Sequence, residues 1–177
     1  TLTENARVPI NSIATGQGAA GPGAAAQGGA GRGGGAAAPA RPQGLTVTGE
    51  VRNYVPVTDA MLRNPDPGDW LMIRRDYRAS NYSPLTQITS GNVKNLRLVW
   101  TWAMSEGGTS QPAPIVHNGI VYLNNAGNTL QALDAKTGEL IWENRYGTKP
   151  SAAAMRGISL YDDKVFVTTD EAHLLAF

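Results

Sequence analysis

The chain has 177 residues, a formal net charge of +1 at neutral pH and no cysteine. A charge so close to zero gives no electrostatic reason to expect binding to nucleic acid or to an anionic membrane. The lack of cysteine excludes a disulfide framework and a thiolate-bound metal. No apolar run approaches the ~20 residues that span a bilayer. No signal peptide is visible, and because the chain begins with Thr1 rather than Met we expect sequence upstream.

The first 44 residues are predicted to form a disordered tether. Between Gly16 and Gly44, 21 of 29 residues are Gly or Ala, and the others are Pro, Gln and Arg. Such a segment has no side chain large enough to bury, so the entropy lost on ordering it would not be compensated. We therefore expect a tether at 1–44, a segment at 45–92 that leads into the folded domain, and the domain itself at 93–177.

A repeat of 44 residues is the most informative pattern. Ile115–Leu133 aligns without a gap with Ser159–Phe177, and the turn pair Asn118-Gly119 falls on the turn pair Asp162-Asp163. Apolar strands flank the turn in both copies. A third, partial copy lies upstream, where Leu98–Trp100 resembles Leu140–Trp142. Self-similarity at this period is typical of repeat architectures such as β-propellers.

The first copy predicts four short strands separated by turns. Hairpin and turn signals delimit them, and the strands are expected at 115–116, 120–123, 130–133 and 139–142. Four strands in about 44 residues correspond to one propeller blade, whereas a β-sandwich or meander would need the self-similarity to be accidental. We predict an all-β protein with two incomplete four-stranded blades. Because the second copy stops at Phe177 and a propeller closes only as a full ring, we expect the natural protein to be several times longer.

The end of the first copy, Ala132 to Trp142, reads ALDAKTGELIW. Small residues at Ala132 and Gly138 leave room beside the strands, and Asp134 can hydrogen-bond its own turn. Trp142 carries a large side chain that must be buried, and the seam between blades is the available place. The pattern A-x-D-x-x-T-G-x-x-x-W matches the tryptophan-docking motif of quinoprotein propellers, which indicates the fold rather than the chemistry.

The segment before the repeats resembles a known family. Its signature residues are Gly68-Asp69-Trp70, Asn81–Leu85, Gln87-Ile88, Asn92-Val93 and Leu96–Trp102. With the repeats, they make residues 59–177 similar to the pyrroloquinoline quinone (PQQ)-dependent alcohol and methanol dehydrogenases. This resemblance implies an eight-bladed propeller with the quinone in its central channel. It also implies that Val93–Trp102 forms a strand of the last blade, added from the N-terminus to close the ring.

The same resemblance implies a function. Family members oxidise an alcohol with PQQ, assisted by calcium or another metal ion and by an Asp base, and pass electrons to a cytochrome c or a quinone in the periplasm. A metal beside the quinone carbonyl makes it a better hydride acceptor, while a buried carboxylate takes the hydroxyl proton. In the family, the base and the metal ligands lie in later blades. We therefore expect no catalytic residue and no metal ligand in this chain, and no activity from the chain alone.

Two cofactor positions carry over from the family. Arg156, in Met155-Arg156-Gly157, matches an arginine that pairs with a PQQ carboxylate, as suits a guanidinium that binds carboxylates bidentately. The alternative is a solvated arginine in a loop between blades. Gln111 stands where the family usually has a glutamate beside the cofactor, and its amide can donate to a carboxylate or carbonyl. The alternative is a residue at a strand start that touches no ligand.

Several features remain open on sequence grounds. The family's adjacent cysteines are replaced by Ser151–Met155, SAAAM, so the disulfide that covers one face of PQQ in that family is impossible here. His117 and His173 lack acidic partners at ligand spacing, so they are interpreted as surface or seam residues rather than a metal site. The chain could also belong to a non-catalytic propeller that uses the same repeat as a scaffold, since the docking motif does not separate the two functions.

Overall fold

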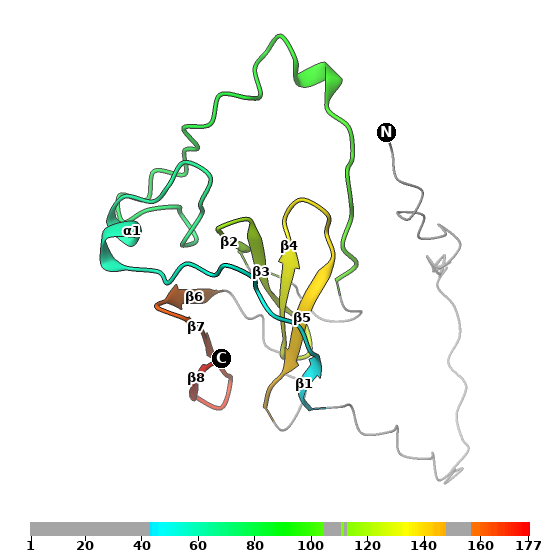
Figure 1. Cartoon of the computed structure of the whole chain (residues 1–177). Helices are drawn as coiled ribbons and strands as arrows, with labels where there is room; N and C mark the ends of the chain where they lie inside the picture. Colours follow the sequence, from blue (N-terminus) through cyan, green and yellow to red (C-terminus); the bar gives the residue numbers. More distant parts are fainter. Residues whose placement is uncertain (1–42, 105–110, 112, 148–156) are drawn as a thin grey trace, which may run out of the picture. The chain divides into compact units, whose positions relative to one another are not determined.

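The computed structural model describes residues 43–104, 111, 113–147 and 157–177. The predicted tether therefore lies outside the described residues except for its end, where Gly44 is the first residue of a strand. The elements in chain order are β1 (Gly44–Val47), α1 (Asp59–Arg63), η3 (Val93–Asn95), β2 (Ile115–His117), β3 (Ile120–Asn125), β4 (Thr129–Asp134), β5 (Leu140–Arg145), β6 (Ile158–Tyr161), β7 (Lys164–Thr168) and β8 (Leu174–Ala176) (Figure 1).

The first sheet is the predicted blade with one addition. Strands β2 to β5 pair antiparallel in sequence order, as four consecutive hairpin-connected strands should. All four strands expected from the first copy are present. The addition is β1, which pairs antiparallel with the outermost strand β5 and gives the order β1-β5-β4-β3-β2.

The second sheet repeats the register of the first. It has three strands in the order β6-β7-β8. Tyr122 opposes Ala132 in the first sheet, and Phe166 opposes Ala176 in the second, 44 positions later in both strands. The two sheets are therefore equivalent at the level of individual cross-strand pairs, which supports the interpretation of the repeat as successive blades.

Turn chemistry explains the tight hairpin between β2 and β3. Asn118 and Gly119 both have positive φ, 48° and 77°. Two consecutive positive φ values match the right-handed twist of the flanking strands, and Asn-Gly is the pair that adopts them at least cost. In the second sheet, Asp162 takes the position of Asn118 with φ of 53°.

The hydrophobic core joins both sheets to the N-terminal segment. Inward-facing residues of the sheets form one buried cluster that also contains Val57 and Leu71. The sheet members are Ile115, Ile120, Tyr122, Leu130, Ala132, Ile158, Leu160, Val165 and Val167. Each sheet is thus buried on the face that meets the other, as neighbouring blades require.

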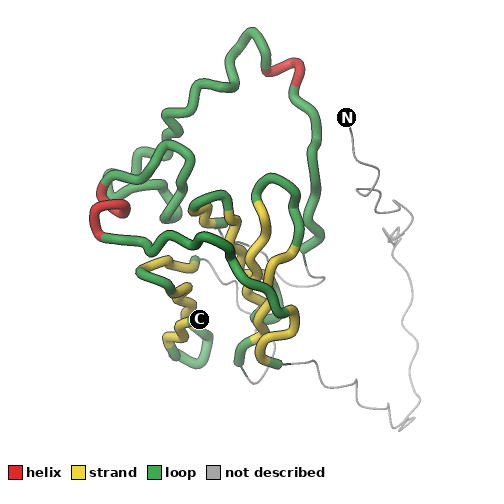
Figure 2. The backbone as a smooth tube through the Cα atoms, viewed as in Figure 1, coloured by secondary structure: helices red, strands yellow, loops and turns green. Residues whose placement is uncertain are grey.

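Residues 64–104 form mostly loop (Figure 2). The strand expected at Val93–Trp102 is absent: Val93–Asn95 is a 3-10 helix, and residues 96–104 join no ladder. A strand needs a partner, and none of the described strands pairs with this segment. Many apolar side chains of residues 64–104 are exposed, among them Tyr82, Ile88, Leu98 and Val99.

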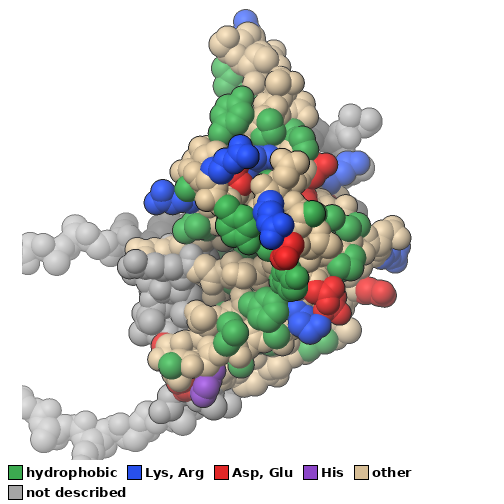
Figure 3. All heavy atoms as spheres, turned by 90° about the vertical axis from the view of Figure 1, so that its left-hand side faces the viewer, with side chains coloured by type: hydrophobic (Ala, Val, Ile, Leu, Met, Phe, Trp, Pro, Cys, Tyr) green, Lys and Arg blue, Asp and Glu red, His purple; other side chains and the backbone are tan. Residues whose placement is uncertain are grey.

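Charges of both signs are interspersed on the face shown in Figure 3, with hydrophobic side chains between them. This mixed surface agrees with the near-zero net charge of the chain. Among the described residues, no helix has the length and apolar character needed to cross a membrane.

Candidate functional site

Of the two cofactor positions predicted from the sequence, the structure describes one. Gln111 is exposed and lies four residues before β2, the edge strand at the opposite side of the sheet from β1. Its amide is therefore available to a ligand at that end of the sheet. Arg156 lies outside the described residues, which resume at Gly157, just before β6.

A buried amide lies at the same end of the first sheet. Ile115 pairs with Tyr122, so the residues that precede β2 run toward the end of β3 that holds Asn124. The Oδ1 atom of Asn124 accepts a hydrogen bond from the Tyr146 hydroxyl over 2.8 Å, while its Nδ2 atom is buried and has no partner. Burial raises the pKa of Tyr146 to about 12, so its hydroxyl stays protonated and donates.

Gln111 and Asn124 each carry an amide that can donate to carboxylate or carbonyl oxygens. Gln111 offers an exposed amide, and Asn124 offers a donor that is costly to leave unpaired in a buried place. PQQ carries carboxylate and carbonyl oxygens, which are acceptors for such donors. Sequence reasoning missed Asn124 because an asparagine inside a strand gives no signal that its nitrogen will lack a partner.

The described residues hold no group of three or more His, Cys, Asp or Glu side chains that could bind a metal ion. His173 is exposed, with its Nδ1 atom 3.8 Å from a carboxylate oxygen of Glu171. The carboxylate pairs Asp162-Asp163 and Asp170-Glu171 are exposed, and both lie at turns.

The surroundings of His117 indicate a role in holding the fold together. Its side chain is buried, and its Nδ1 atom lies 2.7 Å from Oδ2 of Asp69. The Nε2 atom lies 2.7 Å from the carbonyl oxygen of Val55, and the second oxygen of Asp69 accepts from the backbone N–H of Asn118 over 2.9 Å. The histidine therefore links β2 to two N-terminal segments, which the spacing of the two histidines alone did not reveal.

Trp100 contacts the turn of the tryptophan-docking sequence. Its indole Nε1 donates to the carbonyl oxygen of Ala135 over 3.0 Å. A Cβ atom at Gly138 would lie 2.7 Å from ring carbons of Trp100, so only glycine allows this approach. Gly138 also has a φ of +75°, a second reason for glycine. The partial third copy at Leu98–Trp100 was the sequence signal for this contact.

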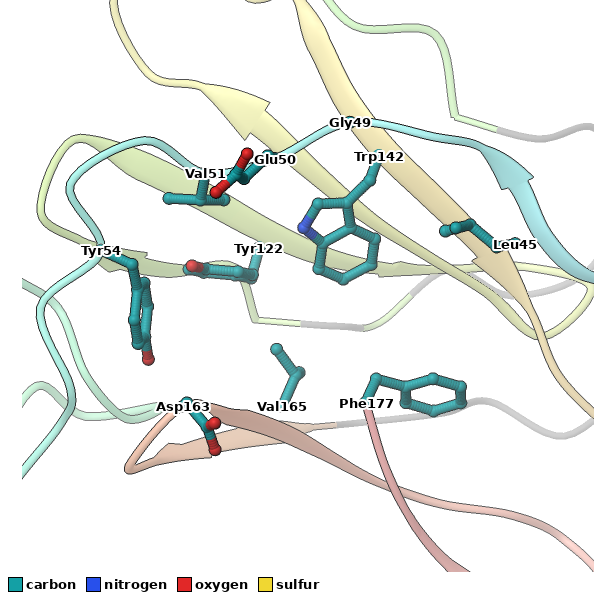
Figure 4. A pocket seen from close by; sticks show the side chains of 10 residues that line it. All are labelled: Leu45, Gly49, Glu50, Val51, Tyr54, Tyr122, Trp142, Asp163, Val165 and Phe177. Atoms are coloured by element: carbon teal, nitrogen blue, oxygen red, sulfur yellow. The ribbon is translucent and has the colours of Figure 1, made fainter.

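Trp142 lies where the two sheets meet. It is half-buried, packs against the core cluster and lies 6.3 Å from Tyr122 between ring centroids. A pocket of about 340 Å³ opens beside it, and Val165 and Phe177 of the second sheet line the opposite wall (Figure 4). Residues 45–54 supply the third wall through Leu45, Gly49, Glu50, Val51 and Tyr54.

A buried polar network crosses the first sheet, and sequence reasoning did not anticipate it. Trp102 Nε1 donates to Oε1 of Gln131 over 3.1 Å, and Nε2 of Gln131 donates to Glu143 over 2.7 Å. Glu143 also accepts from Thr46 and Arg145. Burial alone would raise the pKa of Glu143, but these hydrogen bonds outweigh it and hold the pKa below its usual value.

A protein-family model described as the β-propeller domain of PQQ glucose/ethanol/alcohol dehydrogenases matches residues 70–177. The chain belongs to this PQQ dehydrogenase family. The dehydrogenase subunit of the alcohol dehydrogenase (quinone) of Gluconobacter oxydans is 34% identical over 119 residues, which cover 62% of this chain and 16% of that protein. The chain thus spans less than a fifth of the length of this curated relative.

Solved structures of the family share the fold. The quinohemoprotein alcohol dehydrogenase ADHIIG of Pseudomonas putida superposes with a TM-score of 0.62 at 28% identity, over 69% of this chain and 19% of that one. A europium-containing methanol dehydrogenase superposes with a TM-score of 0.58 at 26% identity, over 67% of this chain and 22% of that one. Both similarities agree with the assignment of the two sheets to a quinoprotein β-propeller.

Proposed function

We propose that this chain is the N-terminal part of a PQQ-dependent dehydrogenase that oxidises an alcohol and passes the electrons to a cytochrome c or a quinone in the periplasm. The observation that carries the proposal is the family match over residues 70–177, where the sheets also repeat at the level of individual strand pairs. A small alcohol is the substrate class, because the similar proteins are named as alcohol and methanol dehydrogenases.

PQQ, when bound, supplies the two-electron acceptor, and calcium or another metal ion bound by residues beyond this chain assists it. The role of this chain is to bind and orient the cofactor. Gln111 would donate its amide to a cofactor oxygen, and Arg156 would pair with a carboxylate. The two residues come from successive repeats, so in a propeller both would face the same channel.

The exposed apolar side chains of the arm at residues 81–99 are evidence that the propeller is larger. Its exposed apolar side chains include Leu98 and Val99, which are 79% and 72% exposed. Apolar residues exposed in a row indicate a surface that another part of the protein covers. We propose that further blades cover this arm in an eight-bladed ring, which would give Val93–Trp102 the partner strand that the described residues lack.

Titration of PQQ into the full-length protein tests the function. With calcium or a lanthanide present, the wild type should bind PQQ, and Arg156→Ala should weaken binding roughly ten- to hundredfold, since a charge-assisted pair contributes about 1.5–3 kcal/mol. Arg156→Lys should recover only part of the affinity, because an ammonium lacks the planar fork. Gln111→Glu should change the affinity or its pH dependence without unfolding the protein.

The outcomes separate the two functional classes. If the wild type binds no PQQ at any metal concentration, the protein is a non-catalytic propeller scaffold. If all the variants bind equally well, the dehydrogenase function stands but both cofactor contacts are wrong. Gln87→Glu, at an exposed glutamine of the N-terminal loop, is the matched control for the charge introduced at position 111.

A further inference from the structure

Residues 44–57, which we call the clasp, run from the outer edge of the first sheet to the hairpin turns of both sheets (Figure 1). They precede the family match, which begins at residue 70. The clasp includes β1 and continues as irregular backbone to Val57, which is 1% exposed. It therefore begins at an edge and ends in the core.

At the outer edge, the clasp covers β5. Leu45 lies opposite Asn144 in the ladder, and the Thr46 hydroxyl donates to Oε1 of Glu143 over 2.7 Å. At Gly49 a Cβ atom would lie 1.9 Å from the carbonyl oxygen of Ile141. No side chain fits there, so this approach of the clasp to β5 depends on glycine.

At its other end, the clasp binds the same position in two successive repeats. Asn118 and Asp162 are 44 residues apart, and each begins the hairpin turn of its sheet with positive φ. Asn118 Nδ2 donates to the carbonyl oxygen of Asn53 over 3.1 Å. Asp162 exchanges two backbone hydrogen bonds with Val57, of 2.9 and 2.8 Å, and its carbonyl also accepts from the Tyr54 hydroxyl over 2.8 Å.

We propose that the clasp is an intramolecular brace that holds the first two blades at a fixed separation while it covers the edge of β5. Backbone hydrogen bonds at both ends make the brace insensitive to most side-chain changes. An uncovered β5 would present unpaired N–H and C=O groups, to which a second copy of the chain could pair. The brace is a property of the fold alone and does not depend on cofactor binding.

The clasp acts as one unit because its middle is packed. Val51 and Tyr54 line the pocket between the sheets, opposite Val165. The Tyr54 ring also lies edge-on to His117, with 5.9 Å between centroids. Release of the clasp from β5 should therefore loosen the hairpin turn at Asp162, although that turn has no ladder contact with β5.

Hydrogen exchange in the full-length protein tests the proposal. Gly49→Ala should displace the clasp and speed amide exchange about five- to tenfold at residues 140–145 and at 161–164 together, because local opening of such hydrogen bonds sets the exchange rate. Gly91→Ala is the matched control, since a Cβ atom there meets only Thr89 Oγ1 at 3.7 Å. It should leave both segments unchanged.

An engineered cross-link supplies a variant that keeps the fold. Leu45→Cys with Asn144→Cys places two thiols on directly opposed residues of the ladder, within the usual range for a disulfide. Oxidation should slow exchange at 161–164 as well as at 140–145, and reduction should reverse both effects. Each single-cysteine variant controls for the substitution itself.

The amide exchange rates at residues 140–145 and 161–164 together decide the proposal. Faster exchange of both in Gly49→Ala, with slower exchange of both in the oxidised cross-link, establishes the brace. Faster exchange confined to 140–145 would show that β1 is only an edge strand and overturns the coupling between blades. If Gly49→Ala fails to fold, the cross-link alone decides, and an oxidised protein with unchanged exchange at 161–164 overturns the proposal.

Discussion

The indole Nε1 of Trp100 donates a hydrogen bond to the carbonyl oxygen of Ala135 over 3.0 Å, although 35 residues separate them in the chain. The ring of Trp100 also covers Gly138, the glycine of the same turn. An N-terminal segment without regular structure is thereby attached to the first sheet. The contact depends on a glycine that the docking pattern specifies, so it can be tested by substitution.

Gly138→Ala should lower the free energy of unfolding of the full-length protein by about 2–4 kcal/mol. A positive φ costs a Cβ-bearing residue about 1–2 kcal/mol, and the new methyl would also push the Trp100 ring away. Gly119→Ala isolates the first effect, because Gly119 has a φ of +77° and open space around its Cβ position. Urea denaturation of both variants measures the difference, and equal midpoints would remove Trp100 from the explanation.

Trp142→Ala should cost about 3–5 kcal/mol in the full-length protein, the usual range for a packed tryptophan. The indole is half-buried between the sheets, beside Tyr122 and opposite Phe177. Denaturant midpoints give the value. Tyr77→Ala, at an aromatic residue that is 67% exposed, is the control. A Trp142→Ala protein with the wild-type midpoint would show that the tryptophan is not docked in a seam.

His117→Ala should destabilise the full-length protein by about 3 kcal/mol, since it removes a buried partner of the Asp69 carboxylate. The same change at His173, which is exposed, should stay within about 0.5 kcal/mol. A double-mutant cycle with Asp69→Asn measures the coupling between the two residues. Additive effects would mean that His117 contributes through packing alone.

Glu143→Gln should reduce stability by about 1–3 kcal/mol at neutral pH, because the carboxylate accepts several hydrogen bonds that an amide cannot all accept. The pKa of Glu143 is lowered in the folded protein. Its contribution is therefore present above the ordinary carboxyl pKa and is lost as the pH falls through the folded value.

The wild type and Glu143→Gln should accordingly converge in stability as the pH falls below about 4.5, the ordinary glutamate value. Chemical denaturation at a series of pH values records this. Glu139→Gln, at an exposed glutamate of the preceding turn, should follow the wild type throughout. A gap between the wild type and Glu143→Gln that does not change with pH would exclude a role for the charge.

The sequence by itself determined the blades. The alternation of apolar residues and the Asn118-Gly119 turn act between neighbouring residues, so they specify strands and register without reference to the rest of the molecule. Because the repeat offset is 44 residues, Phe166 lies opposite Ala176 in the second sheet just as Tyr122 lies opposite Ala132 in the first. The docking sequence and the Asp69-Trp70 segment indicated the family, which the comparison confirmed.

Only the tertiary structure decided the contacts between elements far apart in the chain. Nothing local in Gly44–Val47 predicts that it pairs with β5, and the sequence interpretation placed Gly44 in the tether. The expected strand at Val93–Trp102 is not among the described strands, and a strand depends on a partner edge as well as on its own residues. The partners of His117, Glu143 and Trp100 likewise depend on where the folded segments meet, since hydrogen bonds require a closeness in space that spacing in sequence does not encode.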